Sequence, residues 1–141
     1  MTGFLLDTNV ISEVIKASPE PKVEAWLEST DESQVYLSVL TLGEIRKGIA
    51  TLPRASRRAV LETWLETSLR RRFAGRILPV DELVADRWGR VAAAAGSRGK
   101  PLPVIDGLLA ATALCHNLTL VTRNSGDVAG SGATVFNPWL S

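Results

Sequence analysis

The fold is set near the start of the chain, by Phe4-Leu5-Leu6-Asp7-Thr8-Asn9. Three apolar residues run directly into an acid, a hydroxyl and an amide, a pattern typical of a buried strand that ends in a polar turn. Residues 10–15 then carry apolar side chains at helical spacing. Asp7 is therefore expected where a central strand passes into a helix. In open α/β sheets, ligands usually bind at this carboxyl edge.

The composition is that of an ordinary globular chain. Its 141 residues fit one domain, over residues 1–141, and 45% of them are apolar while 22% are charged. No apolar run approaches the ~20 residues needed to cross a bilayer. Asp7 interrupts the N-terminal region too early for a signal peptide. The single cysteine, Cys115, excludes an internal disulfide and suits a reducing compartment. We therefore expect a cytoplasmic protein without a membrane partner.

Strands alternate with helices along the rest of the chain. The pattern predicts strands at 34–37, 77–80, 118–122 and 134–136, and helices at 10–15, 39–52, 54–73, 81–95 and 104–116, with a further helix around Trp26. Ser38 and Asp81 are placed to cap helices, and Asn117 is placed to end one. This alternation predicts an α/β fold with a mostly parallel sheet covered by helices on both faces.

Three later acids are candidates to join Asp7 at the sheet edge. Glu44 lies on the flank of an apolar helical stripe, Asp106 in the first turn of a helix, and Asp127 in the loop after the clearest strand. Each acid also has a purely structural explanation. Glu44 fits a half-exposed ion pair, Asp106 a favourable charge at a helix N-terminus, and Asp127 an Asx turn. Asp7 fits a helix cap.

Taken together, these acids favour a metal site. If their strands are neighbours, the four carboxylates converge, and anions within ~4–6 Å raise one another's pKa values. A divalent cation removes this conflict, and carboxylate ligands suit Mg²⁺ and Mn²⁺. Such ions activate water and stabilise charge in phosphoryl displacement. A single histidine, His116, and the absence of a CxxC pair argue against zinc. Neither GxGxxG nor a P-loop is present.

Four stretches, in order, resemble one known family. They are Leu6–Glu13, Leu42–Ile49, Asp106–Ala113, and Thr122–Asn124 followed by Asp127. The set is similar to the PIN-domain ribonucleases and, within them, to the VapC-type toxins of bacterial toxin–antitoxin modules. The resemblance covers nearly the whole chain. It implies a PIN-like three-layer sandwich whose parallel sheet has the strand order 3-2-1-4, with a fifth strand at the edge.

The resemblance also implies an activity, which is cleavage of RNA phosphodiesters by metal-activated water to leave a 5′-phosphate and a 3′-hydroxyl. It assigns the Mg²⁺ or Mn²⁺ ligands and catalytic residues as Asp7, Glu44, Asp106 and Asp127, supported by Thr8, Asn9, Thr122 and Asn124. Val128 follows Asp127 where the family commonly has an aromatic residue, which leaves open whether Asp127 binds metal directly. The alternative is a non-catalytic module of the same fold that uses the metal only to contact RNA. A receiver-like phosphoacceptor domain would need a lysine after the last strand, and Phe136-Asn137-Pro138 offers none.

Partners follow from the same resemblance. Arg46, Lys47 and Arg123 are expected to contact RNA phosphates, and the arginine-rich stretch from Arg54 to Arg76 is either a further RNA contact or a solvated helix face. An antitoxin protein is expected to bind an apolar groove, for which core packing is an equally good explanation of each residue. The groove residues are Ile11, Val14, Ile15, Trp26 and Leu27. A homodimer and a toxin–antitoxin hetero-oligomer are also implied.

Overall fold

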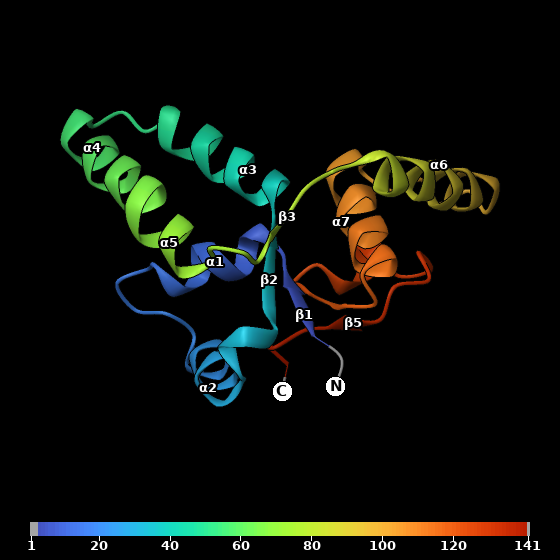
Figure 1. The fold of residues 1–141 in the computed structure, drawn as a ribbon, viewed down its shortest axis with the longest axis horizontal. Helices are drawn as coiled ribbons and strands as arrows, with labels where there is room; N and C mark the ends of the chain where they lie inside the picture. The colour runs from blue at the N-terminus through green and yellow to red at the C-terminus, as the bar shows by residue number, and fades with distance from the viewer. Residues whose placement is uncertain (1–2, 141) are drawn as a thin grey trace.

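A computed structural model describes residues 3–140 as one five-stranded sheet between two layers of helices (Figure 1). The strand order is β3-β2-β1-β4-β5, and every pairing is parallel. The strands are β1 (Phe4–Leu6), β2 (Val35–Ser38), β3 (Ile77–Leu78), β4 (Thr119–Val121) and β5 (Val135–Phe136). The predicted α/β class, the parallel sheet and the strand order are confirmed.

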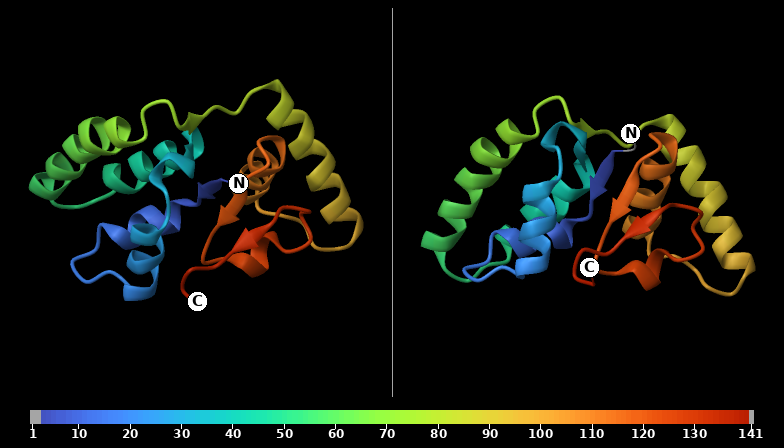
Figure 2. Two further views of the ribbon diagram at one scale, coloured as in Figure 1. Left: turned by 60° about the horizontal axis from the view of Figure 1, so that its bottom comes forward. Right: turned by 90° about the horizontal axis from the view of Figure 1, so that it is seen from below.

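The helices divide between the two faces of the sheet (Figure 2). One face carries α1 (Thr8–Val14), α2 (Pro21–Ser29), α3 (Val39–Ala50), α4 (Ala55–Thr63) and α5 (Arg70–Arg72). The other face carries α7 (Val104–Cys115), with α6 (Glu82–Ser97) packed against it. Short 3₁₀ turns occur at Glu32–Gln34 and Ser125–Val128. Within residues 3–140, no helix has the length and apolar character needed to cross a membrane.

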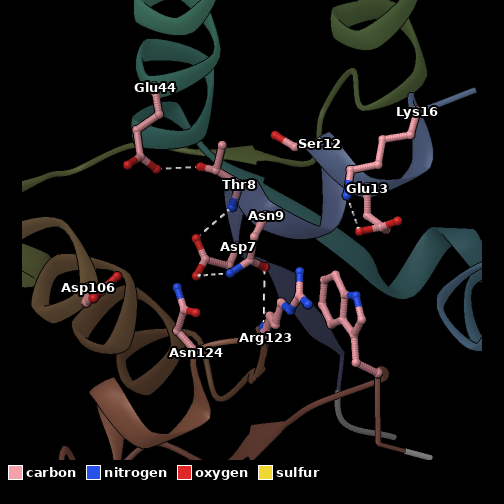
Figure 3. A pocket seen from close by; sticks show the side chains of 11 residues that line it. Asp7, Thr8, Asn9, Ser12, Glu13, Lys16, Glu44, Asp106, Arg123 and Asn124 are labelled. Carbon is pink, nitrogen blue, oxygen red and sulfur yellow. Dashed lines mark hydrogen bonds and ion pairs between the residues drawn. The ribbon is translucent and has the colours of Figure 1, made fainter. Parts of the chain in front are cut away.

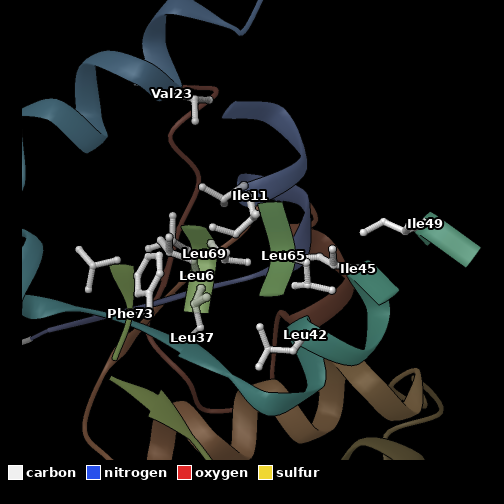
Figure 4. Close-up of a cluster of buried hydrophobic side chains, with 13 residues drawn as sticks. Leu6, Ile11, Val23, Leu37, Leu42, Ile45, Ile49, Leu65, Leu69 and Phe73 are labelled. Carbon is white, nitrogen blue, oxygen red and sulfur yellow. The ribbon is translucent and has the colours of Figure 1, made fainter. Parts of the chain in front are cut away.

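Alternation along the strands builds one apolar core on each face of the sheet. Leu6 points to the side of α1 and α3, where it joins Leu37, Ile45 and Leu65 in the larger cluster (Figure 4). The preceding residue, Leu5, points to the side of α7, where its cluster includes Leu109, Ala113 and Leu120. Each fully buried leucine contributes roughly 1.5–3 kcal/mol. Both faces of β1 are therefore apolar, and the strand is fixed in the centre of the sheet.

The caps and stops predicted from the sequence are present. The hydroxyl of Ser38 accepts from the Leu40 N–H at 3.0 Å, and the Asp81 carboxylate accepts from the Val84 N–H at 3.0 Å. Asn117 adopts φ 53° directly after α7, in the left-handed conformation that ends a helix. These local signals fix where α3, α6 and α7 begin or end.

One predicted helix differs from its expected form. The segment expected as a continuous helix over 54–73 contains a π-helical stretch, Trp64–Leu69, between α4 and α5. Leu65, Leu69 and Phe73 recur at every fourth residue, and all three are buried. A strict four-residue repeat drifts around an α-helix of 3.6 residues per turn. The wider π turn offsets this drift, so the three side chains stay on the core.

The central strands bring their carboxyl ends together. The Asp7 N–H donates to the Val121 carbonyl at 2.9 Å, and the Thr122 N–H donates to the Phe136 carbonyl at 3.0 Å. Asp7 and Thr122 thus leave the sheet side by side from β1 and β4. The chain crosses from β1 to β2 on one side, while β4 pairs on the other, so this is the switch point of the sheet.

Candidate active site

The carboxylate of Asp7 caps α1 and also accepts hydrogen bonds from side chains at the edge of the sheet. Its Oδ1 accepts from the Thr8 N–H at 2.6 Å and so caps α1, while its Oδ2 accepts from the Thr122 hydroxyl at 2.7 Å and the Asn9 amide at 3.3 Å. The residue is only 7% exposed. Burial raises the pKa of Asp7, and the hydrogen bonds from Thr122 and Thr8 offset part of this rise. The carboxylate is therefore held rigidly at the sheet edge.

Glu44 reaches the same place from α3. Its carboxylate accepts from the Thr8 hydroxyl, which lies 3.3 Å from the hydroxyl of the fully buried Thr41. Glu44 is half-buried, and within residues 3–140 it forms no ion pair with a lysine or arginine. The ion-paired surface glutamate considered from the sequence is therefore not what the structure contains.

The pKa of Asp106 is affected by each of the other three acids. It is half-buried in the first turn of α7, and burial is the main cause that raises its pKa. The negative charges of Asp7, Asp127 and Glu44 raise it further, in that order. All three acids therefore lie near enough to repel Asp106, although they come from distant parts of the sequence.

Three of the four acids line a hollow of about 390 Å³ at the carboxyl edge of the sheet (Figure 3). Asp7, Glu44 and Asp106 line it, and so do Thr8, Asn9 and Asn124. Thr122 stands behind the lining, where its hydroxyl also accepts from the Asn124 N–H at 3.0 Å. Asp127 lies in the exposed 3₁₀ turn Ser125–Val128 and is not among the lining residues. The structure thus brings three of the four predicted acids to the hollow and leaves the fourth close by.

The donor set fits a hard divalent cation in its chemistry. All four acids offer carboxylate oxygens, which Mg²⁺ and Mn²⁺ prefer, and their mutual repulsion is the charge such an ion neutralises. Across the described part of the chain, however, no three Asp, Glu, His or Cys side chains are gathered closely enough to hold one ion together. Glu44 is turned onto Thr8, and Asp7 onto Thr122. Coordination by three carboxylates therefore requires side chains to rotate into the hollow.

The predicted RNA-contacting residues separate into different environments. Arg123 lines the acidic hollow. Arg46 instead forms an exposed ion pair with Glu66, N–O 2.7 Å, and Lys47 lines a neighbouring apolar depression beside Glu44 and Ile105. In the arginine-rich stretch, three residues have structural partners. Arg58 donates to the Leu52 carbonyl, Arg72 pairs with Glu32, and Arg76 donates to the carbonyls of Glu32, Val35 and Arg72.

The residues predicted to form the antitoxin groove lie in two different places. Ile11, Val14 and Ile15 line a depression of about 280 Å³ between α1 and the π-helical segment, whose other wall includes Trp64 and Leu69. Trp26 and Leu27 do not line it. They pack on the larger core cluster, where Trp26 lies 5.1 Å from Phe4 and 5.4 Å from Phe136 between ring centroids. Trp26 and Leu27 therefore lie outside this groove. Of the α1 residues that line it, Ile11 is buried in the same core cluster, while Val14 and Ile15 are half-buried.

Several residues at the hollow were not singled out from the sequence. Ser12, Glu13, Lys16 and Trp139 line it, and Thr41 supports Thr8 from behind. Thr41 precedes Glu44 by three residues, and that spacing puts both on one helix face, which is the signal that identifies it. The tryptophan follows Asn137-Pro138, and nothing local in the sequence indicates that it folds back onto α1.

Known proteins match the chain over nearly its whole length. The family model "PIN domain" matches residues 4–126. Toxin FitB of Neisseria gonorrhoeae is 45% identical over 136 residues, which cover 96% of this chain and 98% of FitB. VapC ribonuclease Y4jK of Sinorhizobium fredii is 37% identical over 136 residues, which cover 96% and 97%. The crystal structure of FitAcB from Neisseria gonorrhoeae superposes with a TM-score of 0.93 at 45% identity, over 96% of this chain and 98% of that chain.

Proposed function

The chain belongs to the PIN-domain family and is homologous to the FitB and VapC toxins of toxin–antitoxin systems, and from that premise we propose that it is an Mg²⁺- or Mn²⁺-dependent endoribonuclease toxin. One observation carries the proposal. Asp7, Glu44 and Asp106 come from three different elements and face one hollow, where each of the other acids raises the pKa of Asp106. A stable fold does not need such repulsion, so the arrangement favours a site built to hold cations.

The residues of that site have different proposed roles. Asp7, Glu44 and Asp106 would hold the ion through carboxylate oxygens, with Asp127 adding charge from the edge. When bound, a hard divalent cation activates a water molecule and stabilises the negative charge that develops on a phosphodiester. Thr122 fixes the orientation of the Asp7 carboxylate, and Thr8 does so for Glu44. The proposed products carry a 5′-phosphate and a 3′-hydroxyl.

The proposed partner that silences the enzyme is an antitoxin protein. Solved relatives include complexes of this kind, such as FitAcB. The groove lined by Ile11, Val14 and Ile15 is the proposed contact, because Val14 and Ile15 offer apolar side chains that the core only half covers, beside the buried Ile11. We further propose a homodimer, assembly into a toxin–antitoxin hetero-oligomer, and a cytoplasmic location.

The test is RNA cleavage in Mg²⁺ against an EDTA control. Asp7→Asn and Asp106→Asn should each abolish cleavage while circular dichroism shows a folded chain. Asp86→Asn, a matched change on exposed α6, should leave it intact. The alternative, a non-catalytic module that uses metal to bind RNA, predicts RNA binding without cleavage by the wild-type chain. That result, or full activity in EDTA, would overturn the enzymatic proposal.

A further inference from the structure

A second depression, of about 480 Å³, continues the acidic hollow toward the start of α2. The two share four lining residues, Glu13, Lys16, Arg123 and Trp139. Beyond them the second depression is lined by the loop at Ser18–Pro21. The two depressions therefore adjoin, and we call the four shared residues the wall between them. Glu13, Lys16 and Arg123 are labelled beside the acidic hollow in Figure 3.

A buried carboxylate holds this wall together. Glu13 is 5% exposed, and its oxygens accept from the Lys16 ammonium at 2.9 Å and from the Glu20 N–H at 3.0 Å. Trp139 also donates to it. These partners, led by Lys16, hold the pKa of Glu13 below its usual range. Glu13 thus fixes the C-terminal tryptophan against α1.

Arg123 completes the wall and connects it to the acids. Its guanidinium carbon lies 5.4 Å from the centroid of the Trp139 ring, and it forms no ion pair with any residue in 3–140. Its backbone N–H donates to the Asn9 side chain, whose amide donates in turn to Asp7 and Thr122. Hydrogen bonds through Asn9 therefore connect the backbone of Arg123 to the proposed metal ligand Asp7.

We propose that Arg123, seated on Trp139 and flanked by Lys16, forms a phosphate-binding subsite for the RNA nucleotide next to the scissile one. The inference rests on the proposed ribonuclease function. A polyanion that enters a hollow rimmed by carboxylates needs cations beside them to offset repulsion. Single-stranded RNA is bound through phosphates by basic side chains and through bases by aromatic rings and arginine planes. The wall presents the indole of Trp139, the guanidinium of Arg123 without an ion-pair partner in residues 3–140, and the Lys16 ammonium, which is paired with Glu13. This is the combination that binds single-stranded RNA.

The experiment measures binding of a short, fluorescein-labelled single-stranded RNA of random sequence, by fluorescence anisotropy in Mg²⁺ at several KCl concentrations. The full chain carries Asp106→Asn so that the probe stays intact. Adding Arg123→Gln should weaken binding roughly tenfold and reduce the slope of log K against log salt by about 0.7, the loss of one phosphate contact. Arg87→Gln removes the same charge from an exposed position on α6 and should change neither quantity. Arg123→Lys should restore the slope.

Two results would overturn the subsite. The first is an RNA affinity that Arg123→Gln does not change, or changes no more than Arg87→Gln does. The second is an Arg123→Gln variant that escapes a co-expressed antitoxin while it binds RNA like the parent, which would make the wall a protein contact. Failure of the ribonuclease proposal is distinguishable, because it appears as absent cleavage by the wild-type chain and leaves the binding measurement interpretable.

Discussion

The hydroxyl of Thr122 donates a 2.7 Å hydrogen bond to Oδ2 of Asp7, across a sequence separation of 115 residues. The bond spans the carboxyl ends of β4 and β1, and its acceptor is a buried carboxylate whose pKa is raised by burial. Thr122→Val keeps the size of the side chain but removes this donor. Metal affinity or cleavage should fall roughly ten- to a hundredfold, as for other groups that orient metal ligands.

A matched control for Thr122→Val lies on α7. Thr112 is also fully buried, but its hydroxyl donates to the Leu108 carbonyl at 2.8 Å, within its own helix. Thr112→Val should leave cleavage unchanged. An Mg²⁺ titration of RNA cleavage compares the two variants. Equal activity of Thr122→Val and wild type would show that Asp7 needs no orienting partner.

Much of the fold follows from local sequence signals. The central strand is predictable because Phe4-Leu5-Leu6 is apolar on both faces, and α3 and α6 are predictable because Ser38 and Asp81 cap them. The π-helical stretch at Trp64–Leu69 is not, because it depends on how Leu65 and Leu69 meet the core. The spacing of apolar residues predicts that this segment is helical, but it does not predict that part of the helix is a π-helix.

Part of the site is also predictable from the sequence, and part of it is not. Asp7, Glu44 and Asp106 were predicted to meet because strand topology brings their elements to one sheet edge, and the structure places them around one hollow. The wall formed by Lys16 and Trp139 depends on the path of the last residues across the molecule. No periodicity or capping signal encodes that path, so sequence reasoning alone does not find it.

Burial of Asp106, together with repulsion from the other acids, makes stability depend on pH. Its pKa is raised in the folded chain, so the folded state loses stability as the pH rises through that value and Asp106 becomes charged. In EDTA, Asp106→Asn should therefore be more stable than wild type at pH 8, by about 1 kcal/mol, and the difference should vanish below about pH 3, where Asp106 is neutral in both states. Urea denaturation at the two pH values measures this. Added Mg²⁺ should stabilise wild type more than the variant; the reverse order would contradict the metal assignment.

The contact between α6 and α7 leaves no room for a side chain at Gly107. A Cβ there would lie 3.0 Å from Nε1 and 3.1 Å from Cδ1 of Trp88. Gly107→Ala should therefore lower the free energy of unfolding by about 1 kcal/mol, despite the helix propensity of alanine. Gly89→Ala in α6 meets nothing within 4 Å and should stabilise by about 0.5–1 kcal/mol. Thermal denaturation measures whether each variant is destabilised or stabilised. A stabilised Gly107→Ala would show that the Trp88 side chain moves to make room for the added methyl group.

The groove beside α1 can be tested apart from catalysis. Ile15 is half-buried there, and Ile15→Glu would place a charge against any apolar helix bound in the groove. Affinity for the cognate antitoxin should fall at least about tenfold, while RNA cleavage stays intact. Val60→Glu on α4, where Val60 is 60% exposed, is the matched control. Calorimetric titration of antitoxin into each variant measures the affinity. An unchanged affinity of Ile15→Glu would show that the antitoxin does not bind in this groove.

Glu13 gives a pH dependence of the opposite sign to Asp106. Its pKa lies below the ordinary 4.5, chiefly because of Lys16, so its carboxylate stabilises the fold above that range and this stability is lost as the pH falls through the lowered pKa. Glu13→Gln should reduce the free energy of unfolding at pH 7 by roughly 1–3 kcal/mol. The difference from wild type should shrink as the pH falls through this lowered pKa, below which both side chains are neutral. Glu24→Gln, on the exposed side of α2, should show neither effect. A deficit in Glu13→Gln that is constant with pH would mean that shape, and not charge, holds Trp139 against α1.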